Sequence, residues 1–377
     1  MLRFYLVSAL LHVYIGSRLI PDLLLLSALA AAALSVCLAA SAILIPYGFQ
    51  MRRATLEGRA HALAWAGLLA MGLFSSLFVL TLLRDVALLA GYTLSLFMLI
   101  DAQVQQFSEW SAAAVPALAT LFTGVGFFNA RRRAKVRRVD IPIASLPAAL
   151  HGFTIAQISD VHIGPTIRGH HLDAIVDAVN ALGADMIAVT GDLVDGSVAQ
   201  LARHTAPLSR LSARHGTFFV TGNHEYYSGV HAWVAELRRI GLRVLLNEHV
   251  VLQHDGAQMI VAGVTDFNAG RFDPSHASHP AGAIAGAPDA VSVLLAHQPR
   301  SALAAQCAGY DLQLSGHTHG GQFMPWNFFV RFQQPFTAGL HRLGKLWVYV
   351  SRGTGYWGPP KRLGAPSEIT HLRLVPA

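Results

Sequence analysis

Histidine, aspartate and asparagine side chains recur directly after short apolar runs beyond residue 150 of this 377-residue chain. The clearest case is SGHTHGGQ, residues 315–322, where two histidines stand one residue apart among glycines. Side chains at positions i and i+2 of an extended backbone point to the same side, so His317 and His319 can reach two neighbouring points. Two imidazoles placed in this way are typical of a site that binds metal ions.

Four other apolar runs end in side chains of the same chemical kind. With the first example, the run ends supply five histidines, two aspartates and one asparagine: Asp160, His162, Asp192, Asn223, His224, His297, His317 and His319. One such residue after a strand is usually an ordinary turn or surface residue. Five run ends in succession that all carry metal-type ligands indicate a shared function, because the ends of neighbouring strands meet at one edge of a sheet.

Carboxylate, amide and imidazole ligands suit divalent Mn, Fe or Zn better than soft metals. The two cysteines, Cys37 and Cys307, form no paired motif, which argues against a structural zinc site. The donors are too numerous for one ion and fit two ions that share a bridging carboxylate. Two metals about 3.5–4 Å apart form a clamp for in-line attack on phosphorus by a bridging hydroxide. The residues therefore predict a dinuclear hydrolytic site.

The apolar runs alternate with stretches of helical periodicity, which predicts an α/β domain. Strands are expected at 153–159, 185–191, 216–222, 242–246, 249–253, 257–263, 291–296, 311–315, 346–351 and 369–375. Between the first two runs, Leu172, Ile175 and Val179 follow helical spacing. Such an alternation would bring the run ends, and with them the metal-type residues, to one edge of a sheet.

The first third of the chain has a different character. The whole chain is 53% hydrophobic and only 13% charged, which is too apolar for an ordinary soluble domain. A bilayer crossing needs about 20 apolar residues. Candidate spans are 4–20, 23–46, 60–83, 86–101 and 107–129, and the fourth is short enough to belong to a bent hairpin. No clean cleavage site follows the first span, so it is expected to be retained. Residues 1–130 are therefore predicted to form a transmembrane helical domain of four to five spans.

A basic block, RRRAKVRR, occupies residues 131–138 and supplies six of the net seven positive charges. This concentration indicates a juxtamembrane segment rather than a nucleic-acid surface, so no nucleic acid partner is expected. We predict a linker over 131–150 and a catalytic domain over 151–377. The positive-inside rule places that domain on the cytoplasmic side of the cell (inner) membrane, in a multi-pass protein. Arg52, Arg53 and Arg59 fit this orientation with four spans and conflict with it if there are five.

Five motifs occur in order along the second part of the chain: DVH at 160–162, GDLVD at 191–195, GNHE at 222–225, an isolated His297, and GHTH at 316–319. Together they resemble the five blocks of the calcineurin-like metallophosphoesterases. The longer strings around them are most similar to the bacterial YkuE/YaeI-type phosphodiesterases. The apolar N-terminal part resembles the layout of transmembrane proteins with a metallophosphoesterase domain.

The resemblance implies a four-layer α/β/β/α sandwich, with two mixed sheets flanked by helices, and a metal-dependent phosphoric ester hydrolase of phosphodiesterase type. It implies two divalent metal ions of uncertain identity, with manganese, iron and zinc as the candidates. One would be held by Asp160, His162, His319 and the bridging Asp192, and the other by Asp192, Asn223, His297 and His317. His224 would bind no metal and would protonate the leaving oxygen.

The substrate is less well defined by the sequence. The phosphoprotein phosphatase branch of the family has arginines where this chain has Gly196 and Thr221, which argues against phosphoprotein substrates. The aromatic segment FMPWNFFVRFQQPF, 323–336, is either an ordinary core or lid segment or an exposed surface suited to acyl chains. A phosphodiester, with a lipid or lipid-linked ester as one candidate, is expected. The alternatives are a tethered phosphodiesterase for soluble nucleotides and a non-enzymatic metal-binding membrane sensor.

Overall fold

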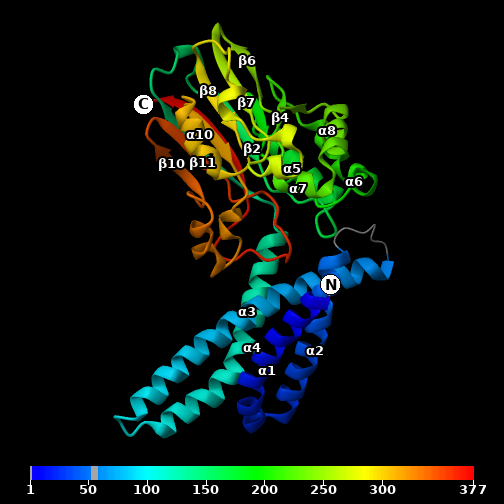
Figure 1. Cartoon of the computed structure of the whole chain (residues 1–377), viewed down its shortest axis with the longest axis vertical. Coiled ribbons are helices and arrows are strands. Elements are labelled where there is room, and N and C mark those ends of the chain that lie inside the picture. The colour runs from blue at the N-terminus through cyan, green and yellow to red at the C-terminus, as the bar shows by residue number, and fades with distance from the viewer. Residues whose placement is uncertain (1, 52–57) are drawn as a thin grey trace. The chain divides into compact units, whose positions relative to one another are not determined.

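The computed structural model describes residues 2–51 and 58–377, so Arg52 and Arg53 lie outside the described residues. The chain divides into two compact units. One comprises Met1–Phe128 with Gly358–Lys361, and the other comprises Asn129–Trp357 with Arg362–Ala377. The first unit is built on helices, and the second combines strands and helices (Figure 1).

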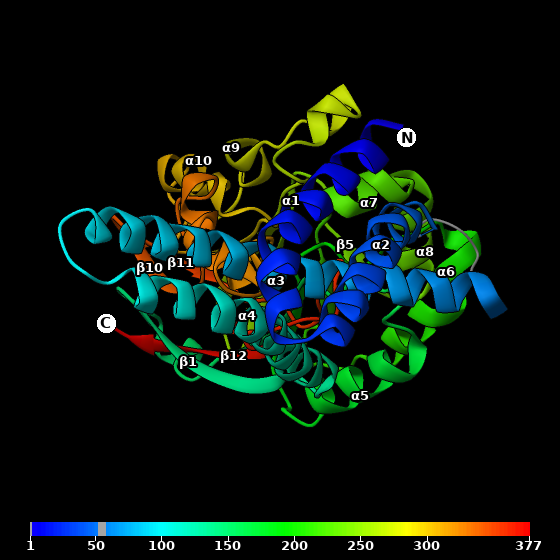
Figure 2. The ribbon, with the colours of Figure 1, turned by 90° about the horizontal axis from the view of Figure 1, so that it is seen from below.

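In the described part of the chain, four helices are long and apolar enough to cross a membrane: α1 (Leu2–Leu26), α2 (Ala28–Met51), α3 (Gly58–Ser95) and α4 (Asp101–Arg131). They share a core that includes Ile15, Leu77 and Ala112. The second half of α3 runs beside α4 in both views (Figures 1 and 2). The expected spans 60–83 and 86–101 fall largely within the single helix α3, so the described helices correspond to four spans rather than five.

The charge that interrupts the apolar sequence of α3 is satisfied inside the helical unit. Arg84 is 4% exposed and pairs with Asp22 of α1. Its guanidinium also donates to Ser111 Oγ and to the carbonyl of Arg18, each at 2.9 Å. A charged side chain among apolar helices is stable only when it is paired and hydrogen-bonded in this way. The helix therefore continues through Arg84 instead of ending there.

The described residues of the second unit form two six-stranded mixed sheets. The first has the order β1 (Lys135–Ile143), β12 (Glu368–Pro376), β2 (Thr154–Ile158), β3 (Met186–Val189), β4 (Thr217–Phe219) and β5 (Arg243–Val244). The second has the order β10 (Gly339–Leu343), β11 (Leu346–Val350), β9 (Leu312–Ser315), β8 (Val291–Leu295), β7 (Ala257–Gly263) and β6 (Glu248–His254). Strands β2 to β5 are parallel, as are β7, β8, β9 and β11, so these carboxyl ends point the same way within each sheet.

The helices of this unit are α5 (Gly169–Asn180), α6 (Val198–Thr205), α7 (Asn223–Ser228), α8 (Val230–Arg239), α9 (Pro280–Ala283) and α10 (Ala302–Cys307). Figure 1 shows α5, α6 and α8 on one side of the sheets and α10 on the other. Phe218 of the first sheet and Leu314 of the second share the core between the sheets. Val176 and Trp233 pack the outer helices onto the first sheet, and Ala305 belongs to the core outside the second. The expected four-layer α/β/β/α sandwich is therefore confirmed.

Two strands occur where the sequence did not lead us to expect them. Residues 135–143, within the range predicted as a linker, form β1, which pairs in parallel with β12 over its whole length. Only the end of β1 is buried, at Ile141 and Ile143. The other is β10, an edge strand whose residues are mostly half-buried. Both lie at the outer edge of a sheet, where burial, and with it the alternating apolar pattern, is weak.

Candidate metal centre

The ends of β2, β3, β4, β8 and β9 carry all of the metal-type side chains that the sequence singled out. Asp160 and His162 follow β2, and Asp192 follows β3. Asn223 and His224 begin α7, shortly after β4. His297 follows β8, and His317 and His319 follow β9: these complete the set. Two of the strands that matter here, β8 and β9, belong to the second sheet, so the centre lies where both sheets end.

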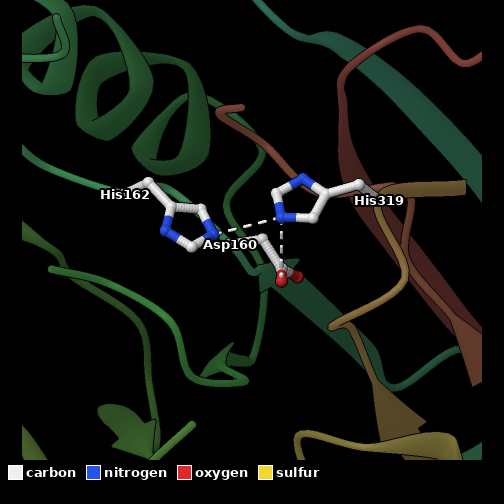
Figure 3. Close-up of side chains that lie close together, drawn as sticks. All are labelled: Asp160, His162 and His319. Atoms are coloured by element: carbon white, nitrogen blue, oxygen red, sulfur yellow. Dashed lines mark hydrogen bonds and ion pairs between the residues drawn. The ribbon is translucent and has the colours of Figure 1, made fainter. Parts of the chain in front are cut away.

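The first group of donor atoms joins the loops after β2 and β9. Nε2 of His319 lies 3.5 Å from Oδ1 of Asp160 and 3.1 Å from Nε2 of His162. In Figure 3 the two rings point toward each other, with the Asp160 carboxylate beside them. All three side chains are buried, and their donor atoms lie within 4.8 Å of one another. This spacing is compatible with a single ion between them.

The second group is centred on Asp192. Its Oδ2 lies 3.2 Å from Nε2 of His297 and 3.8 Å from Nε2 of His162. Nδ1 of His317 lies 3.1 Å from the same nitrogen of His297. The other nitrogen of His297, Nδ1, donates to the carbonyl of Thr190 at 2.8 Å, which leaves Nε2 free to bind a metal. Asp192 therefore stands between the two groups.

Asn223 supplies an independent observation that a ligand belongs here. Its side-chain oxygen Oδ1 is buried and has no hydrogen-bond partner among the described residues. A buried polar atom without a partner costs about 1–3 kcal/mol, and such atoms are rare in folded proteins. An amide oxygen at the edge of a carboxylate and imidazole cluster is a suitable ligand for a divalent cation. The residues present therefore fit a bound metal.

One donor atom of His224 also lies within 4.8 Å of donor atoms of His162 and Asp192, but His224 makes further contacts of a different kind. Its backbone N–H donates to Oδ1 of Asp192 at 2.8 Å, and its Nε2 lies 3.9 Å from Oδ2 of the same residue. Its Nδ1 forms a short hydrogen bond with Oδ1 of Asp195. That carboxylate also lies 3.3 Å from Nδ1 of His162. Asp195 thus fixes the ring orientation of both histidines and leaves each Nε2 directed toward the cluster.

Five of these residues adopt a backbone conformation that is unfavourable for a residue with a side chain. The φ angles are +54° at Asp160, +54° at His162, +51° at Asp192, +69° at His317 and +51° at His319. The left-handed region costs roughly 1–2 kcal/mol for a non-glycine residue. Such outliers gather at functional sites, where the surrounding structure holds side chains in a required direction. Their concentration at the five positions supports the assignment of this region as the functional centre.

The comparison with known proteins agrees with this geometry. Residues 153–321 match the family model described as calcineurin-like phosphoesterase. The chain is 32% identical over 245 residues to an uncharacterized metallophosphoesterase of Aquifex aeolicus, covering 64% of this chain and 91% of that protein. The chain belongs to the calcineurin-like phosphoesterase family. The family expected from the five motifs is therefore confirmed.

Two further relatives carry metallophosphoesterase in their names, and one of these names also refers to a transmembrane protein. The "Transmembrane protein with metallophosphoesterase domain" of Bos taurus is 40% identical over 278 residues, which is 70% of this chain and 63% of the relative. The metallophosphoesterase YkuE of Bacillus subtilis is 31% identical over 238 residues, or 61% of this chain and 81% of that protein. The chain thus spans less than two thirds of the length of the bovine relative.

Burial sets the charge state of the candidate ligands in this phosphoesterase. It lowers the pKa of His317 to about 3, with the neighbouring His297 adding to the effect. Burial also holds the pKa of His319 well below its usual range, helped by His162. Both imidazoles are therefore neutral at pH 7, as metal binding requires. For Asp192, burial acts to raise the pKa, but imidazole neighbours led by His297 outweigh it and hold the pKa well below its usual range.

Glu225 stands in the GNHE motif but was assigned no role from the sequence. Its carboxylate is fully buried and accepts backbone N–H groups of Gly222, Asp192 and Leu193 at 2.7, 3.0 and 2.7 Å. It therefore fastens the loop after β3 to the loop after β4. Burial, followed by the charge of Asp192, raises its pKa to about 7. A glutamate three residues into a helix start is a common capping signal, which could have indicated this position.

Arg362 was also not assigned to the centre. Its buried guanidinium donates to the carbonyls of His319 and Arg352 at 3.1 and 2.7 Å, and lies 3.2 Å from Nδ1 of His319. Burial lowers its pKa to about 10, so it stays charged at neutral pH. It contacts Nδ1 of His319, whereas Nε2 of the same ring faces Asp160. Its distance in sequence from the five motifs left no local signal for this contact.

Proposed function

We propose that this phosphoesterase binds two divalent cations, one in each donor group, and hydrolyses a phosphate ester. Asp160, His162, His319 and the bridging Asp192 would hold one ion, and Asp192, Asn223, His297 and His317 the other. The observation that carries this proposal is the buried, unpartnered oxygen of Asn223 beside two groups of donors, which are connected by the closeness of His162 to Asp192. The donor set suits Mn²⁺, Fe²⁺ or Zn²⁺.

Such a pair of ions would supply Lewis acidity for the phosphoryl oxygens and for an attacking water, which is the chemistry of in-line displacement at phosphorus. His224 of this chain would give a proton to the leaving oxygen through Nε2. The carboxylate of Asp195 accepts the N–H of the other nitrogen of His224 and stabilises the doubly protonated ring, in which the proton on Nε2 would face the cluster. Asp195 is therefore a positioning residue rather than a participant in bond breaking.

The test uses the full chain in detergent, with metal analysis and a panel of aryl phosphodiester and monoester substrates. We expect at least two divalent ions per chain and metal-dependent turnover. The change His224→Ala should lower kcat by about 10²- to 10⁴-fold, the usual contribution of a general acid, and leave the metal content unchanged. Unchanged turnover in this variant would remove His224 from the proposed role. A wild-type chain that binds metal but hydrolyses no ester would favour a non-enzymatic sensor.

We further propose that the substrate carries an acyl chain. The aromatic segment beside the centre is exposed: Trp326 is 40% exposed, Phe329 53% and Phe332 74%. It begins directly after the loop of His319, where the space above Gly321 is filled by Asn327. Contiguous exposed apolar surface on a folded domain is typical of a binding site for an apolar partner. A lipid substrate would also lie in the same membrane as the four apolar helices of this chain.

The lipid proposal is tested by a double change, Phe329→Ser with Phe332→Ser. We expect kcat/KM for a long-chain phosphodiester in mixed micelles to fall by at least tenfold, while turnover of a soluble aryl phosphodiester stays unchanged. Leu303→Ser is the matched control, because Leu303 is 66% exposed and lies on α10 rather than in the aromatic segment. Efficient hydrolysis of nucleotide diesters with no activity on lipids would support a tethered nucleotide phosphodiesterase instead.

We propose that the catalytic unit faces the cytoplasm. With four crossings, the connection between α2 and α3 and the basic block at 131–138 lie on one side of the membrane, so Arg59 agrees with the block. The connections on the other side, at residue 27 and at 96–100, contain no Lys or Arg. Because Lys and Arg are enriched in cytoplasmic connections, this asymmetry supports a cytoplasmic position for the side that carries the basic block. Five spans would instead have placed Arg59 on the side opposite the basic block.

A further inference from the structure

A second group of metal-type side chains lies outside the proposed catalytic centre. It consists of His231 at the start of α8, and Asp273 and His276 in the connection between β7 and β8. One donor atom of each lies within 4.8 Å of the others. None of the three belongs to the five motifs of the phosphoesterase family.

The donor atoms are already close to the arrangement that a tetrahedral ion requires. Nε2 of His231 lies 3.2 Å from Oδ2 of Asp273. Two ligands that each lie about 2.0–2.2 Å from zinc in tetrahedral geometry are separated by about 3.3 Å. The rings of His231 and His276 have centroids 5.2 Å apart and an interplanar angle of 68°. Little movement is therefore needed for the three side chains to share one ion.

The remaining atoms of the group are oriented by neighbours, as is usual around a bound metal. Oδ1 of Asp273 accepts the backbone N–H and the hydroxyl of Ser275 at 3.0 and 2.6 Å, which leaves Oδ2 directed at His231. Nδ1 of His276 is hydrogen-bonded to the hydroxyl of Tyr226 at 2.9 Å, which leaves its Nε2 as the metal-binding atom. These contacts distinguish the group from a chance meeting of mobile surface side chains.

The group lies where a bound ion would join a long connection to a helix. The connection from 264 to 290 contains only short helical turns and α9, and long connections with so little regular structure are usually functional. Asp273 and His276 belong to this connection, whereas His231 belongs to α8. Tyr226, which orients His276, belongs to α7, the helix that carries Asn223 and His224.

We propose that His231, Asp273 and His276 bind a zinc-class divalent cation, separate from the catalytic pair, which fastens the 264–290 connection to α7 and α8. Two imidazoles and one carboxylate form the donor set of open zinc sites, with a water in the fourth position. His231 has a side chain that is 72% exposed, so the ion can enter from solvent. The ion stabilises the connection by joining two segments far apart in sequence.

The connection also contacts the catalytic residues through aromatic side chains. Phe272, next to Asp273, lies 5.5 Å from the ring of Tyr227, measured between centroids. Tyr227 in turn lies 5.2 Å from the ring of His224. An ion that orders the connection therefore acts on the surroundings of His224 without touching the substrate.

The experiment is a zinc count on the full chain in detergent. The protein is stripped of metal and titrated with zinc against a chromophoric chelator of known affinity. We expect wild-type protein to bind one more zinc per chain than the variants His231→Ala and Asp273→Asn, and Tyr226→Phe to bind that zinc about 10- to 100-fold more weakly. His170→Ala is the control, because His170 is exposed and lies outside both groups.

Two outcomes decide the proposal. The change Asp192→Asn, which alters the catalytic centre, should leave the additional zinc in place. A separate site is supported if Asp192→Asn keeps this zinc and His231→Ala loses it. An equal zinc count in wild-type protein and in both His231→Ala and Asp273→Asn overturns the proposal and reduces the group to a surface ion pair. Because His231 is exposed, its replacement by alanine is expected to leave the fold intact, which a thermal melt in detergent verifies.

Discussion

The contact that deserves testing first at the residue scale is the one between Asp195 and two histidines of the centre. Its Oδ1 bonds Nδ1 of His224 and lies 3.3 Å from Nδ1 of His162. The carboxylate determines which nitrogen of each ring carries the proton. In catalytic histidine pairs of this kind, changing the carboxylate to an amide preserves shape and alters the tautomer.

We therefore predict that Asp195→Asn lowers kcat by about 10²- to 10⁴-fold while KM for an aryl phosphodiester changes little. The measurement is steady-state kinetics at saturating metal, since weaker orientation of His162 is also expected to reduce metal affinity about 10- to 100-fold. The control is Asp173→Asn, an exposed aspartate paired with Arg210. Equal kcat in Asp195→Asn and wild-type protein would contradict the positioning role.

At the scale of elements, the centre depends on how closely the loops after β3 and β4 approach each other. A Cβ added to Gly222 would lie 2.2 Å from Oδ1 of Asp192 and 2.5 Å from its backbone nitrogen. Gly222 itself has an ordinary extended backbone, with φ of −95°. The absence of a side chain is therefore required here by space and not by conformation.

We predict that Gly222→Ala displaces Asp192, lowers activity by at least 10²-fold and lowers the free energy of unfolding by about 1–3 kcal/mol, the usual cost of overpacking. Activity assays and thermal unfolding in detergent measure the two effects. Gly216→Ala, just before the same strand, is the matched control. Its φ is +84° but nothing lies within 4 Å of the added Cβ, so it should lose stability and keep its activity. If both variants retained full activity, the close approach of the loops after β3 and β4 would not be required for activity.

These elements also show what the sequence could and could not predict. The strands that carry the candidate ligands are buried, and their apolar runs were recognised, with Asp160 and Asp192 at their ends. A local capping signal could have indicated Glu225, but its hydrogen bonds to the loop after β3 join segments about 30 residues apart and have no local signal. The extended backbone expected at His317 and His319 was wrong, because both residues lie in the left-handed region, which is uncommon for residues other than glycine.

The same reasoning explains two errors, the division of α3 into two spans and the missed strand β1. The pair Arg84 and Asp85 interrupts the hydrophobic run and was interpreted as the end of one span and the start of the next. In the structure Arg84 is neutralised by Asp22, which lies on another helix. Strand β1 was missed for a related reason, since its basic first half resembles a solvated linker. Its strand conformation comes from pairing with β12, more than 200 residues away.

At the scale of the whole molecule, the orientation of the chain determines which pool of substrate it meets. A cytoplasmic catalytic unit would act on the inner leaflet and on cytoplasmic esters, whereas the opposite orientation would act outside the cell. The chain offers a direct probe, because it has two cysteines, Cys37 and Cys307. Cys307 is exposed on α10 of the catalytic unit, and Cys37 is half-buried in α2.

We predict that, in a Cys37→Ser background, Cys307 in sealed right-side-out membrane vesicles does not react with a membrane-impermeant maleimide and reacts fully once detergent is added. The reason is that the basic block and the catalytic unit that follows it stay on the cytoplasmic side, where positive charge is retained. The chain with both Cys37→Ser and Cys307→Ser should give no signal under either condition. Labelling of Cys307 in the sealed vesicles would place the catalytic unit outside and, with it, restrict the substrate to esters of the outer leaflet or the external medium.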